Sequence, residues 1–574
     1  MPRTLPRPAE PAVTVVELRL LDGPNLYFTQ PAVKLTLGVD PWLRLPEDRT
    51  EELAERAGFQ AATHPGTVGS EQRRRFVARF AVHLARSLAT EMATNLAVRG
   101  RLGAEPNEVV IAFPWRRQQT AQAFARSLAG LLQRSLDRRR SVKRGMAQAV
   151  KVVTRSDPGP PPTVAHPRIP VVAVTGTNGK TTTVRLIAHL ARAAGRHVAY
   201  TTTDGVYCDD RLVEAGDYSG FSGAATALAQ PEVDVAVLET ARGGILLRGI
   251  GTAHNDVAVV TNVTADHLGQ YGIHSLDQLA EVKATITRIT RPDGWDVLNA
   301  DDPRVLGMRR HASGQSWLVS LDPDHPAIRS VLAERGRASS ILDGAMVMMT
   351  SRRHVHRLLA VDDVPMTLAG ISRHNVSNAM AAAAAAIGAG IPEEAVIDGL
   401  RSFVLDPEKN PGRANVFEID SRVVVVDYAH NEDGMRGLVE ICHGLRAPGG
   451  RVFLSFASAG DRTDAIIHRL AYTAARGADR VGIAELHRYL RGRDPAQLLR
   501  QLQAGVLDGG KPEAAVFPNE VEALEWMLRE SAPNDVLAIT ALAQRFEIFS
   551  LLRERGGVSA SPERVKALVR RARG

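Results

Sequence analysis

The stretch VVAVTGTNGKTTTVRLIAHLARAAG, residues 171–195, decides the fold of this chain. It begins with an apolar run typical of a buried strand and ends with the apolar spacing of a helix. Between them, TGTNGKTTT places Gly176 and Gly179 where the backbone must turn tightly, so that consecutive N–H groups can face a phosphate. Lys180 and Thr181 then offer an ammonium for phosphate oxygens and a hydroxyl for Mg²⁺. We therefore predict a nucleotide phosphate-binding loop, or P-loop, between a strand and a helix.

Beyond this loop, apolar runs typical of strands alternate with helical stretches. Strands are predicted at 234–240 and 256–263, followed by a helix near 276–289. A second series of strands is predicted at 422–431, 451–458, 479–485 and 535–540. Such alternation is typical of parallel sheets covered by helices. The predicted fold class is α/β, with a P-loop central domain and a smaller, Rossmann-like doubly wound C-terminal domain.

A proline-rich linker precedes the P-loop region at residues 155–170. Before it, the pattern predicts strands at 13–21 and 107–115 and helices at 73–98 and 118–136, which indicates a small α+β domain. The predicted division of the chain is as follows: N-terminal domain 1–154, linker 155–170, central ATP-binding domain 171–408 and C-terminal domain 409–574.

Composition excludes several classes of protein. The 574 residues include only two cysteines, which cannot form a disulfide framework or a four-cysteine zinc site. The longest apolar run, residues 379–391, is alanine-rich and too short to cross a bilayer, so we expect a buried helix there, no membrane partner and a cytoplasmic location. The net charge of +8 suits anionic substrates. Only eight of the 71 basic residues are lysines, so each lysine is a candidate for chemistry that arginine cannot perform.

Three further residues follow the P-loop at positions suited to phosphate and metal chemistry. Glu239 ends a predicted strand, at the edge where ligands bind in open α/β sheets. His267 follows the next strand, and Lys283 lies on the predicted helix behind it. Taken singly, each has an ordinary structural explanation: a salt-bridge partner, a loop histidine and a solvated helix charge. Their order behind a P-loop favours a shared site.

The motifs together resemble the Mur ligases, which join a carboxylate to an amine using ATP. The resemblance rests on the order of the following segments: TGTNGKTTT (175–183), the strand ending at Glu239, TNVTADHLGQYG (261–272), Lys283, LNADDP (298–303), SRHNVSNAMAA (372–382), NPGR (410–413) and VDYAHN (426–431). Within that family the chain looks most like the Mur-like half of cyanophycin synthetases. The resemblance extends from about residue 169 to the C-terminus, and residues 1–154 resemble the N-terminal domain of cyanophycin synthetases only faintly, through LRLLDGPN (18–25).

The resemblance implies specific roles for residues of the P-loop and beyond it. Lys180 would hold the phosphates, Thr181 and Glu239 one Mg²⁺, and Glu239, His267 and Lys283 a second. Lys283 would carry CO₂ as a carbamate, and Arg413 would reach the γ-phosphate, so the implied catalytic residues are Lys180, His267, Lys283 and Arg413. The implied ATP-binding residues are Gly176, Thr177, Asn178, Gly179, Lys180, Thr181, Thr182, Asn299, His374, Asn375, Asn378, Arg413, Asp427, His430 and Asn431.

The chain departs from the resembled family in ways that bear on its partners. Cyanophycin synthetases carry an ATP-grasp domain before the Mur-like half, where this chain has only the linker; a separate ATP-grasp protein could supply that reaction, or the product could differ. Glu432 stands where the family usually has proline. Residues 491–494 lie roughly where the family binds its incoming amine, and a solvated loop explains them equally well. We expect a small-molecule or acidic peptide substrate, an amino acid as the amine, and a homo-oligomer.

Three hypotheses about function follow. The first is an ATP-dependent, ADP-forming ligase of a carboxylate and an amine, working through an acyl phosphate. The second is a non-catalytic ATP-binding scaffold or regulatory subunit of a separate ATP-grasp ligase. The third, nucleic-acid binding, is prompted by the basic runs at 134–144 and 565–574, and it is disfavoured because no aromatic residues interleave with the charges.

Overall fold

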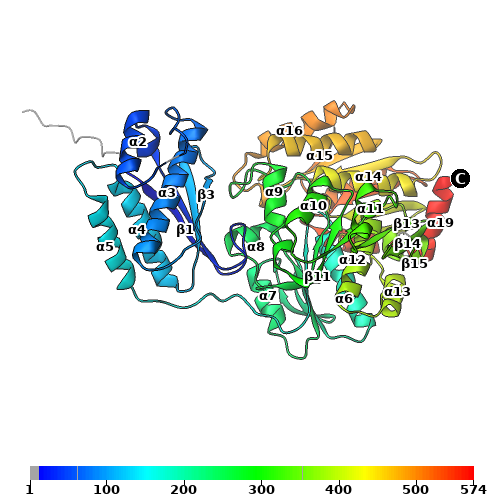
Figure 1. Ribbon diagram of the computed structural model, residues 1–574. Helices are drawn as coiled ribbons and strands as arrows, with labels where there is room; N and C mark the ends of the chain where they lie inside the picture. The colour runs from blue at the N-terminus through cyan, green and yellow to red at the C-terminus, as the bar shows by residue number, and fades with distance from the viewer. Residues whose placement is uncertain (1–11, 61, 352, 513) are drawn as a thin grey trace, which may run out of the picture.

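The computed structural model describes residues 12–60, 62–351, 353–512 and 514–574. Three sheets organise these residues, and each is formed by strands from one of the three predicted domain ranges. Figure 1 shows the N-terminal sheet and its helices as a separate lobe beside a larger body formed by the other two sheets. The domain boundaries themselves stay a prediction.

The N-terminal lobe is a four-stranded antiparallel sheet with the order β1-β2-β4-β3. Helices α3 and α4 bury their apolar faces against it, and Trp42, Phe76 and Phe80 are fully buried in this core. The elements are β1 (Thr14–Leu21), β2 (Ala32–Gly38), α1 (Asp40–Leu43), α2 (Glu47–Arg56), α3 (Glu71–Glu91), β3 (Arg99–Leu102), β4 (Glu108–Pro114), α4 (Gln118–Arg134) and α5 (Val142–Thr154).

The central sheet has eleven strands in the order β15-β14-β13-β12-β11-β10-β5-β9-β6-β7-β8. Its middle strands run parallel and are buried on both faces, as the valine-rich sequences of β5 (Val171–Thr175), β9 (Val235–Glu239) and β10 (Asn255–Val260) predict. The other strands are β6 (Val198–Thr201), β7 (Gly205–Cys208), β8 (Arg211–Ala215), β11 (Thr290–Asn299), β12 (Gln315–Val319), β13 (Arg337–Leu342), β14 (Ala345–Met349) and β15 (Val355–Ala360).

Helices cover both faces of this sheet. The alanine-rich α12 (Arg373–Gly388) is buried throughout residues 378–386, which confirms a buried helix in the predicted stretch 379–391, although the helix ends at Gly388. The other helices of this region are α6 (Lys180–Ala193), α7 (Phe221–Leu228), α8 (Arg242–Leu247), α9 (Leu276–Lys283), α10 (Pro303–Met308), α11 (Pro326–Ala333) and α13 (Glu393–Ser402).

The C-terminal sheet has seven strands in the order β20-β19-β18-β21-β17-β16-β22, and the five from β20 to β17 are parallel. The Rossmann-like arrangement predicted for this region is confirmed. Its strands are β16 (Asn415–Ile419), β17 (Arg422–Asp427), β18 (Val452–Phe456), β19 (Arg480–Ala484), β20 (Ala515–Phe517), β21 (Val536–Thr540) and β22 (Val558–Ser559). Its helices are α14 (Glu432–Leu445), α15 (Asp464–Gly477), α16 (Pro495–Asp508), α17 (Glu520–Glu530), α18 (Arg545–Glu554) and α19 (Pro562–Arg573).

Two predicted helices are shorter than their apolar spacing indicates. The helix expected at 73–98 ends at Glu91, because the backbone reverses at Ala93, whose φ is +55°. The helix expected near 276–289 ends at Lys283 and is followed by a separate 3₁₀ turn, Thr287–Ile289. Its early end leaves Lys283 in the last turn, where its side chain can leave the helix toward the P-loop.

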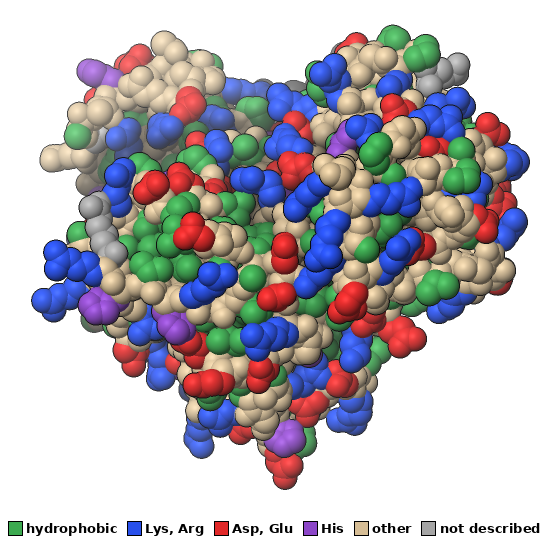
Figure 2. Space-filling view, turned by 90° about the vertical axis from the view of Figure 1, so that its right-hand side faces the viewer, with side chains coloured by type: hydrophobic (Ala, Val, Ile, Leu, Met, Phe, Trp, Pro, Cys, Tyr) green, Lys and Arg blue, Asp and Glu red, His purple; other side chains and the backbone are tan. Residues whose placement is uncertain are grey.

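Within the described residues, no helix combines the length and the apolar character that crossing a membrane requires. The face of the molecule that carries α19 shows positive and negative side chains interspersed, with no continuous basic surface (Figure 2). The basic C-terminal run is partly neutralised, since Lys566 forms an ion pair with Asp363.

A buried carboxyl group in β11 makes the stability of the fold depend on pH. Burial raises the pKa of Asp296 from its ordinary value of 3.8 to about 7, although Thr290 and the backbone N–H of Gly314 both donate to it. The folded state therefore favours the protonated carboxyl. The protonated Asp296 contributes its full share to the free energy of unfolding below about pH 4, and this contribution is lost as the pH rises through 7.

We expect Asp296→Asn to remove this component, because an amide can donate to Thr290 and accept from Gly314 without ionising. At pH 8 the free energy of unfolding of the variant should exceed that of the wild type by a few kcal/mol, because each unit of pKa shift corresponds to about 1.4 kcal/mol. At pH 4 the two should be alike. Urea unfolding at both pH values measures the difference, with Asp293→Asn, an exposed carboxylate of the same strand, as the control. A difference that does not change with pH would contradict the assignment.

Candidate active site

The P-loop is built as the sequence predicts, between β5 and α6. Gly176 has a φ of +154° and Gly179 a φ of +86°. A Cβ on Gly176 would lie 1.8 Å from the hydroxyl of Thr261, so a side chain there is excluded by space as well as by conformation. Thr261 in turn donates to the carbonyl of Asn178 at 2.6 Å. The loop is therefore held in shape by the end of β10.

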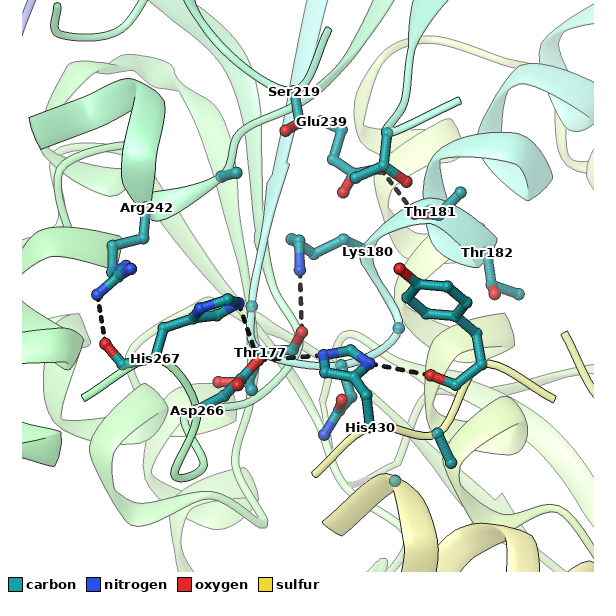
Figure 3. Close-up of a pocket in the computed structure, with 18 of the residues that line it drawn as sticks. Thr177, Lys180, Thr181, Thr182, Ser219, Glu239, Arg242, Asp266, His267 and His430 are labelled. Atoms are coloured by element: carbon teal, nitrogen blue, oxygen red, sulfur yellow. Dashed lines mark hydrogen bonds and ion pairs between the residues drawn. The ribbon is translucent and has the colours of Figure 1, made fainter. Parts of the chain in front are cut away.

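Lys180 begins α6 and reaches back over the loop. Its Nζ donates to the carbonyl of Thr177 at 2.9 Å, and Figure 3 shows the side chain pointing into the cavity. Thr181 is buried, and its hydroxyl donates to Oε2 of Glu239 at 2.8 Å. Because Glu239 ends β9, next to β5 in the sheet, the sheet order alone brings these side chains together.

Glu239 has a buried carboxylate oxygen that is available to a ligand. It is 2% exposed, and burial raises the pKa of its carboxyl group, against the nearby charge of Lys180. Oε1 is buried and has no hydrogen-bond partner in the described part of the chain. A buried carboxylate oxygen with no donor is costly, and a cation bound beside it would remove that cost.

Lys283 comes to the same place from the end of α9. Its Nζ donates to the carbonyl of Gly176 at 2.6 Å, and the side chain is 4% exposed. Burial, together with the nearby charge of Lys180, holds the pKa of this amine well below its usual range. The buried amine therefore lies against the P-loop itself rather than in solvent.

His267 lies beside Asp266 on the loop after β10 (Figure 3), in a strained conformation with a φ of +53°. Burial lowers the pKa of its imidazole to about 4, so the ring is neutral at pH 7. Nδ1 is buried and finds no hydrogen-bond partner among the described residues. A neutral imidazole with an open nitrogen is the form that binds metal ions.

The neighbouring Asp266 links the central region to the C-terminal one. Its Oδ2 accepts from Nε2 of His430 at 3.1 Å, and Arg462 lies 3.4 Å from Oδ1. Burial by itself would raise the pKa of Asp266, but the hydrogen bond from His430 and the charge of Arg462 hold it well below its usual range. This carboxylate thus holds two C-terminal side chains against the loop after β10. Figure 3 shows the contact with His430.

Two more contacts join the same regions. Asn178 of the P-loop donates to Asn431 at 3.1 Å and to Asp433 at 3.1 Å, at the start of α14. Asp204 forms ion pairs with Arg185 of the central region and Arg545 of the C-terminal region. The cavity is therefore closed on one side by the C-terminal sheet.

The C-terminal region also contributes Arg413 and Asp427. The guanidinium of Arg413 stacks 4.8 Å from the ring of Tyr428, and its Nη2 lies 3.5 Å from the hydroxyl of Thr181. Asp427 ends β17, where burial raises the pKa of its carboxyl group against the charge of Arg413. Its Oδ2 accepts from the backbone N–H of Ala414 at 2.7 Å.

These residues surround one cavity of about 770 Å³. All of the predicted catalytic, ATP-binding and metal-binding residues line it, except Asn299 and Asn431. Asn299 lies outside the lining because its amide donates to the carbonyl of Thr261 at 2.8 Å. Asn431 is fully buried, caps α14 through Gly434 and donates to Asn178 at 2.9 Å. Both side chains support the P-loop surroundings instead of facing the cavity.

Sequence reasoning missed two of the arginines that line the cavity, Arg242 and Arg462, whereas Arg491 belongs to the segment 491–494 that was expected near the incoming amine. Arg242 donates to the carbonyl of His267 at 2.6 Å and to Gln270 at 2.8 Å. Arg462 pairs with Asp461, which also accepts from Gln270 and pairs with Arg491. Because 63 of the basic residues are arginines, no single arginine stands out in the sequence.

The donors fit a magnesium ion held partly by a substrate. Among the described residues, no group of three or more His, Cys, Asp and Glu side chains could hold a metal unaided. Mg²⁺ commonly binds through one or two carboxylates, waters and substrate phosphates instead. The unpartnered oxygen of Glu239 and the hydroxyl of Thr181, beside a P-loop, match that pattern.

Comparison with known families gives two matches. Residues 174–386 match the Mur ligase middle domain, and residues 412–541 match the Mur ligase glutamate ligase domain. Together they cover more than half of the chain. The matched segments contain the P-loop, Glu239, His267 and Lys283 in the first, and Arg413, Asp427 and His430 in the second.

Similar proteins point the same way. A cyanophycin synthetase from Synechocystis sp. is 39% identical over 65% of this chain and 42% of its own length. The chain thus matches less than half of that relative. A UDP-N-acetylmuramoyl-L-alanyl-D-glutamate–2,6-diaminopimelate ligase from Synechococcus sp. is 28% identical over 65% of this chain and 72% of its own. Among solved structures, a bifunctional folylpolyglutamate synthase/dihydrofolate synthase from Yersinia pestis shares the fold, with a TM-score of 0.50, 19% identity, and coverage of 67% of this chain and 89% of its own.

Proposed function

The chain belongs to the Mur ligase family, and from that premise we propose that it is an ATP-dependent, ADP-forming ligase that joins a carboxylate to an amine. The observation that carries the proposal is the convergence of Lys180, Glu239, Lys283 and Arg413 on one cavity, from four separate elements of the chain. A protein that only bound ATP could also use the P-loop, Glu239 and Arg413, but it would have no need of the buried amine of Lys283 beside them.

The proposed reaction has two steps. A carboxylate oxygen of the acid attacks the γ-phosphorus of ATP, the bond to the β-phosphate oxygen breaks, and ADP leaves with that bond's electrons. The amine nitrogen then attacks the acyl carbon of the resulting acyl phosphate, inorganic phosphate leaves, and the nitrogen loses a proton. Negative charge moves between oxygens in both steps, so fixed cations and N–H donors are the groups that stabilise the transition states.

The residues of the P-loop would bind the triphosphate. The backbone N–H groups of Thr177 and Asn178 already donate to Asn262, so the phosphates would be met by those at Gly179 and the start of α6. Lys180 adds a point charge, and the N-terminus of α6 favours an anion. Arg413, held over the ring of Tyr428, would approach the γ-phosphate from the opposite wall. His374, Asn375 and Asn378 of α12 would lie along the nucleotide, and Asp427 would accept from its ribose hydroxyls.

Metal binding is proposed for two places in the cavity. Thr181 and Glu239 would hold one Mg²⁺, while Glu239, His267 and Lys283 would hold a second. The ions, when bound, would neutralise charge on the phosphate and carboxylate oxygens. The two open atoms, Oε1 of Glu239 and Nδ1 of His267, are the side-chain atoms free to take part without losing another contact.

Lys283 would serve that second ion only after modification, because an ammonium cannot bind a cation. Its Nζ would bond to the carbon of CO₂ and lose a proton, giving a carbamate with an anionic oxygen pair. Arginine cannot undergo this change, which explains why lysine occupies position 283 in a chain with only eight lysines.

The acid and the amine are proposed from the cavity's charge. Arg242, Arg462 and Arg491 line the cavity and suit an acid that carries more than one negative charge. An acidic peptide or aspartate polymer, with an amino acid such as arginine as the amine, is the first combination to test. A separate ATP-grasp protein remains our proposed source of such an acid, and a homo-oligomer our expectation for the assembly.

The test is amine-dependent phosphate release by the purified full chain with ATP and Mg²⁺. We expect release with at least one pair of acid and amine, and a product whose mass is the sum of both minus one water. ATP with either substrate alone should give little release. A panel of acidic peptides, aspartate polymers and amino acids covers the proposed class.

The competing scaffold hypothesis makes a different prediction. It predicts tight ATP binding, no amine-dependent release with any pair, and a change in the activity of a separate ATP-grasp ligase when the chain is added. Binding of ATP with neither release nor a mass-identified product across the panel would overturn the ligase proposal in favour of the scaffold.

A further inference from the structure

The turn between β1 and β2, residues 22–28, docks on the central region rather than pointing into solvent. Figure 1 shows this turn lying against α8. The backbone N–H of Asp22 donates to the carbonyl of Arg248 at 2.9 Å, and the N–H of Ile250 donates back to Pro24 at 2.7 Å. A Cβ on Gly23 would lie 1.8 Å from the carbonyl of Ile250, so only glycine permits this approach.

Hydrogen bonds to the side chain of Asn25 fix the shape of the turn. Asn25 is 1% exposed, and its side chain bonds within the turn, donating to Gly23 and Gln30 and accepting from the N–H groups of Tyr27 and Phe28. An asparagine that satisfies the backbone in this way fixes one conformation. The turn therefore keeps one shape, and we call residues 22–28 the wedge.

The wedge reaches the helix that carries Lys283. Leu26 and Tyr27 belong to the same hydrophobic cluster as Val282 of α9 and Ile286 just beyond it. The carbonyl of Leu26 accepts from Arg288 at 3.4 Å. Apolar side chains from two regions thus share one core directly behind α9.

An ion pair adds a directional contact to this core. Arg101 of β3 binds Glu281 of α9 through both guanidinium nitrogens, the longer bond being 2.8 Å. Glu281 lies two residues before Lys283. Helix α9 has only eight residues, too few to be stable without tertiary contacts, so its neighbours fix its position.

We propose that the N-terminal lobe is a positioning element for the active site, in which Arg101 holds Glu281, and with it α9, so that Lys283 stays seated against the P-loop. The proposal rests on the proposed function, in which Lys283 serves catalysis. Arg101 does not line the cavity, so it acts only through α9. A displacement of about 1 Å at a reacting group can cost about 100-fold in rate, so a modest shift of α9 is enough.

The first test compares Arg101→Ala and Glu281→Ala with the wild type. We expect kcat to fall about tenfold or more, with the KM for ATP within about twofold, because the P-loop is untouched. Hydrogen exchange should quicken in residues 276–283 and stay unchanged in β10. The melting temperature should hardly move, since the pair is about one-third exposed. The double charge reversal Arg101→Glu with Glu281→Arg should recover part of kcat.

The control is Arg564→Ala, which removes a similar two-nitrogen ion pair with Glu418, remote from the cavity. It should leave kcat and exchange in α9 unchanged. Unaltered kcat and α9 exchange in Arg101→Ala would overturn the inference, as would a uniform loss of stability and ATP binding. Faster α9 exchange in a chain whose wild type shows no ligase activity would leave this inference standing and count against the proposed function alone.

Discussion

Lys180→Ala should reduce ATP turnover at least about 1000-fold, the largest effect expected of any single substitution in this chain. The ammonium of Lys180 is held over the P-loop by the carbonyl of Thr177 and faces the cavity, so its charge is already in place when the phosphates arrive. Phosphate release under saturating ATP measures the loss. Lys180→Met, which keeps the length of the side chain without its charge, should be as impaired as the alanine variant.

The matched control is Lys566→Ala, because Lys566 lies on α19 and pairs with Asp363 at the surface. Its turnover should equal that of the wild type. Circular dichroism and melting curves of all three variants separate misfolding from lost chemistry. Turnover in Lys180→Met within about tenfold of the wild type would show that the charge is not needed.

Lys283→Arg is expected to lower kcat by at least about 100-fold while ATP binding changes little. Arginine keeps a positive charge but cannot form a carbamate, and the buried space beside Gly176 suits an amine. Isothermal titration with a non-hydrolysable ATP analogue measures binding, and phosphate release measures turnover. Normal turnover in this variant would refute the carbamate role.

A second variant guards against a simple steric effect of arginine. Lys283→Ala leaves a space that a small molecule can enter. If the working group is an anionic carbamate, short carboxylates such as acetate should restore part of the activity. If it is the ammonium, short alkylamines should restore it instead, and the carbamate assignment would be wrong.

The sequence predicted the parts of the site that local chemistry dictates. TGTNGKTTT specifies a strand, two glycine turns and a helix start within one short segment, and the structure has all three. Glu239 could be placed because strand ends meet at one edge of a parallel sheet. The C-terminal sheet was predictable because apolar strands such as β17 alternate with helical stretches along the sequence.

Contacts between distant segments were not predictable in this way. Nothing local to Asp266 indicates that His430 and Arg462 bind it, because the partners are separated by more than 160 residues. Asn299 and Asn431 have the right type for a nucleotide contact, but their amides are already engaged by backbone and side-chain partners near the P-loop. The docking of Gly23 on Ile250 depends on the fit of two surfaces, which no periodic pattern encodes.

The apolar cluster that the wedge shares with α9 ties together two lobes that Figure 1 draws apart. Leu26 and Tyr27 are sheltered from water only while both lobes are folded, so melting of either one exposes surface on the other. Calorimetry should therefore record the N-terminal lobe and the central region unfolding in one merged transition. A protease that cleaves the chain at 155–170 should yield two fragments that still co-elute on gel filtration, because the shared apolar cluster holds them together without a covalent link.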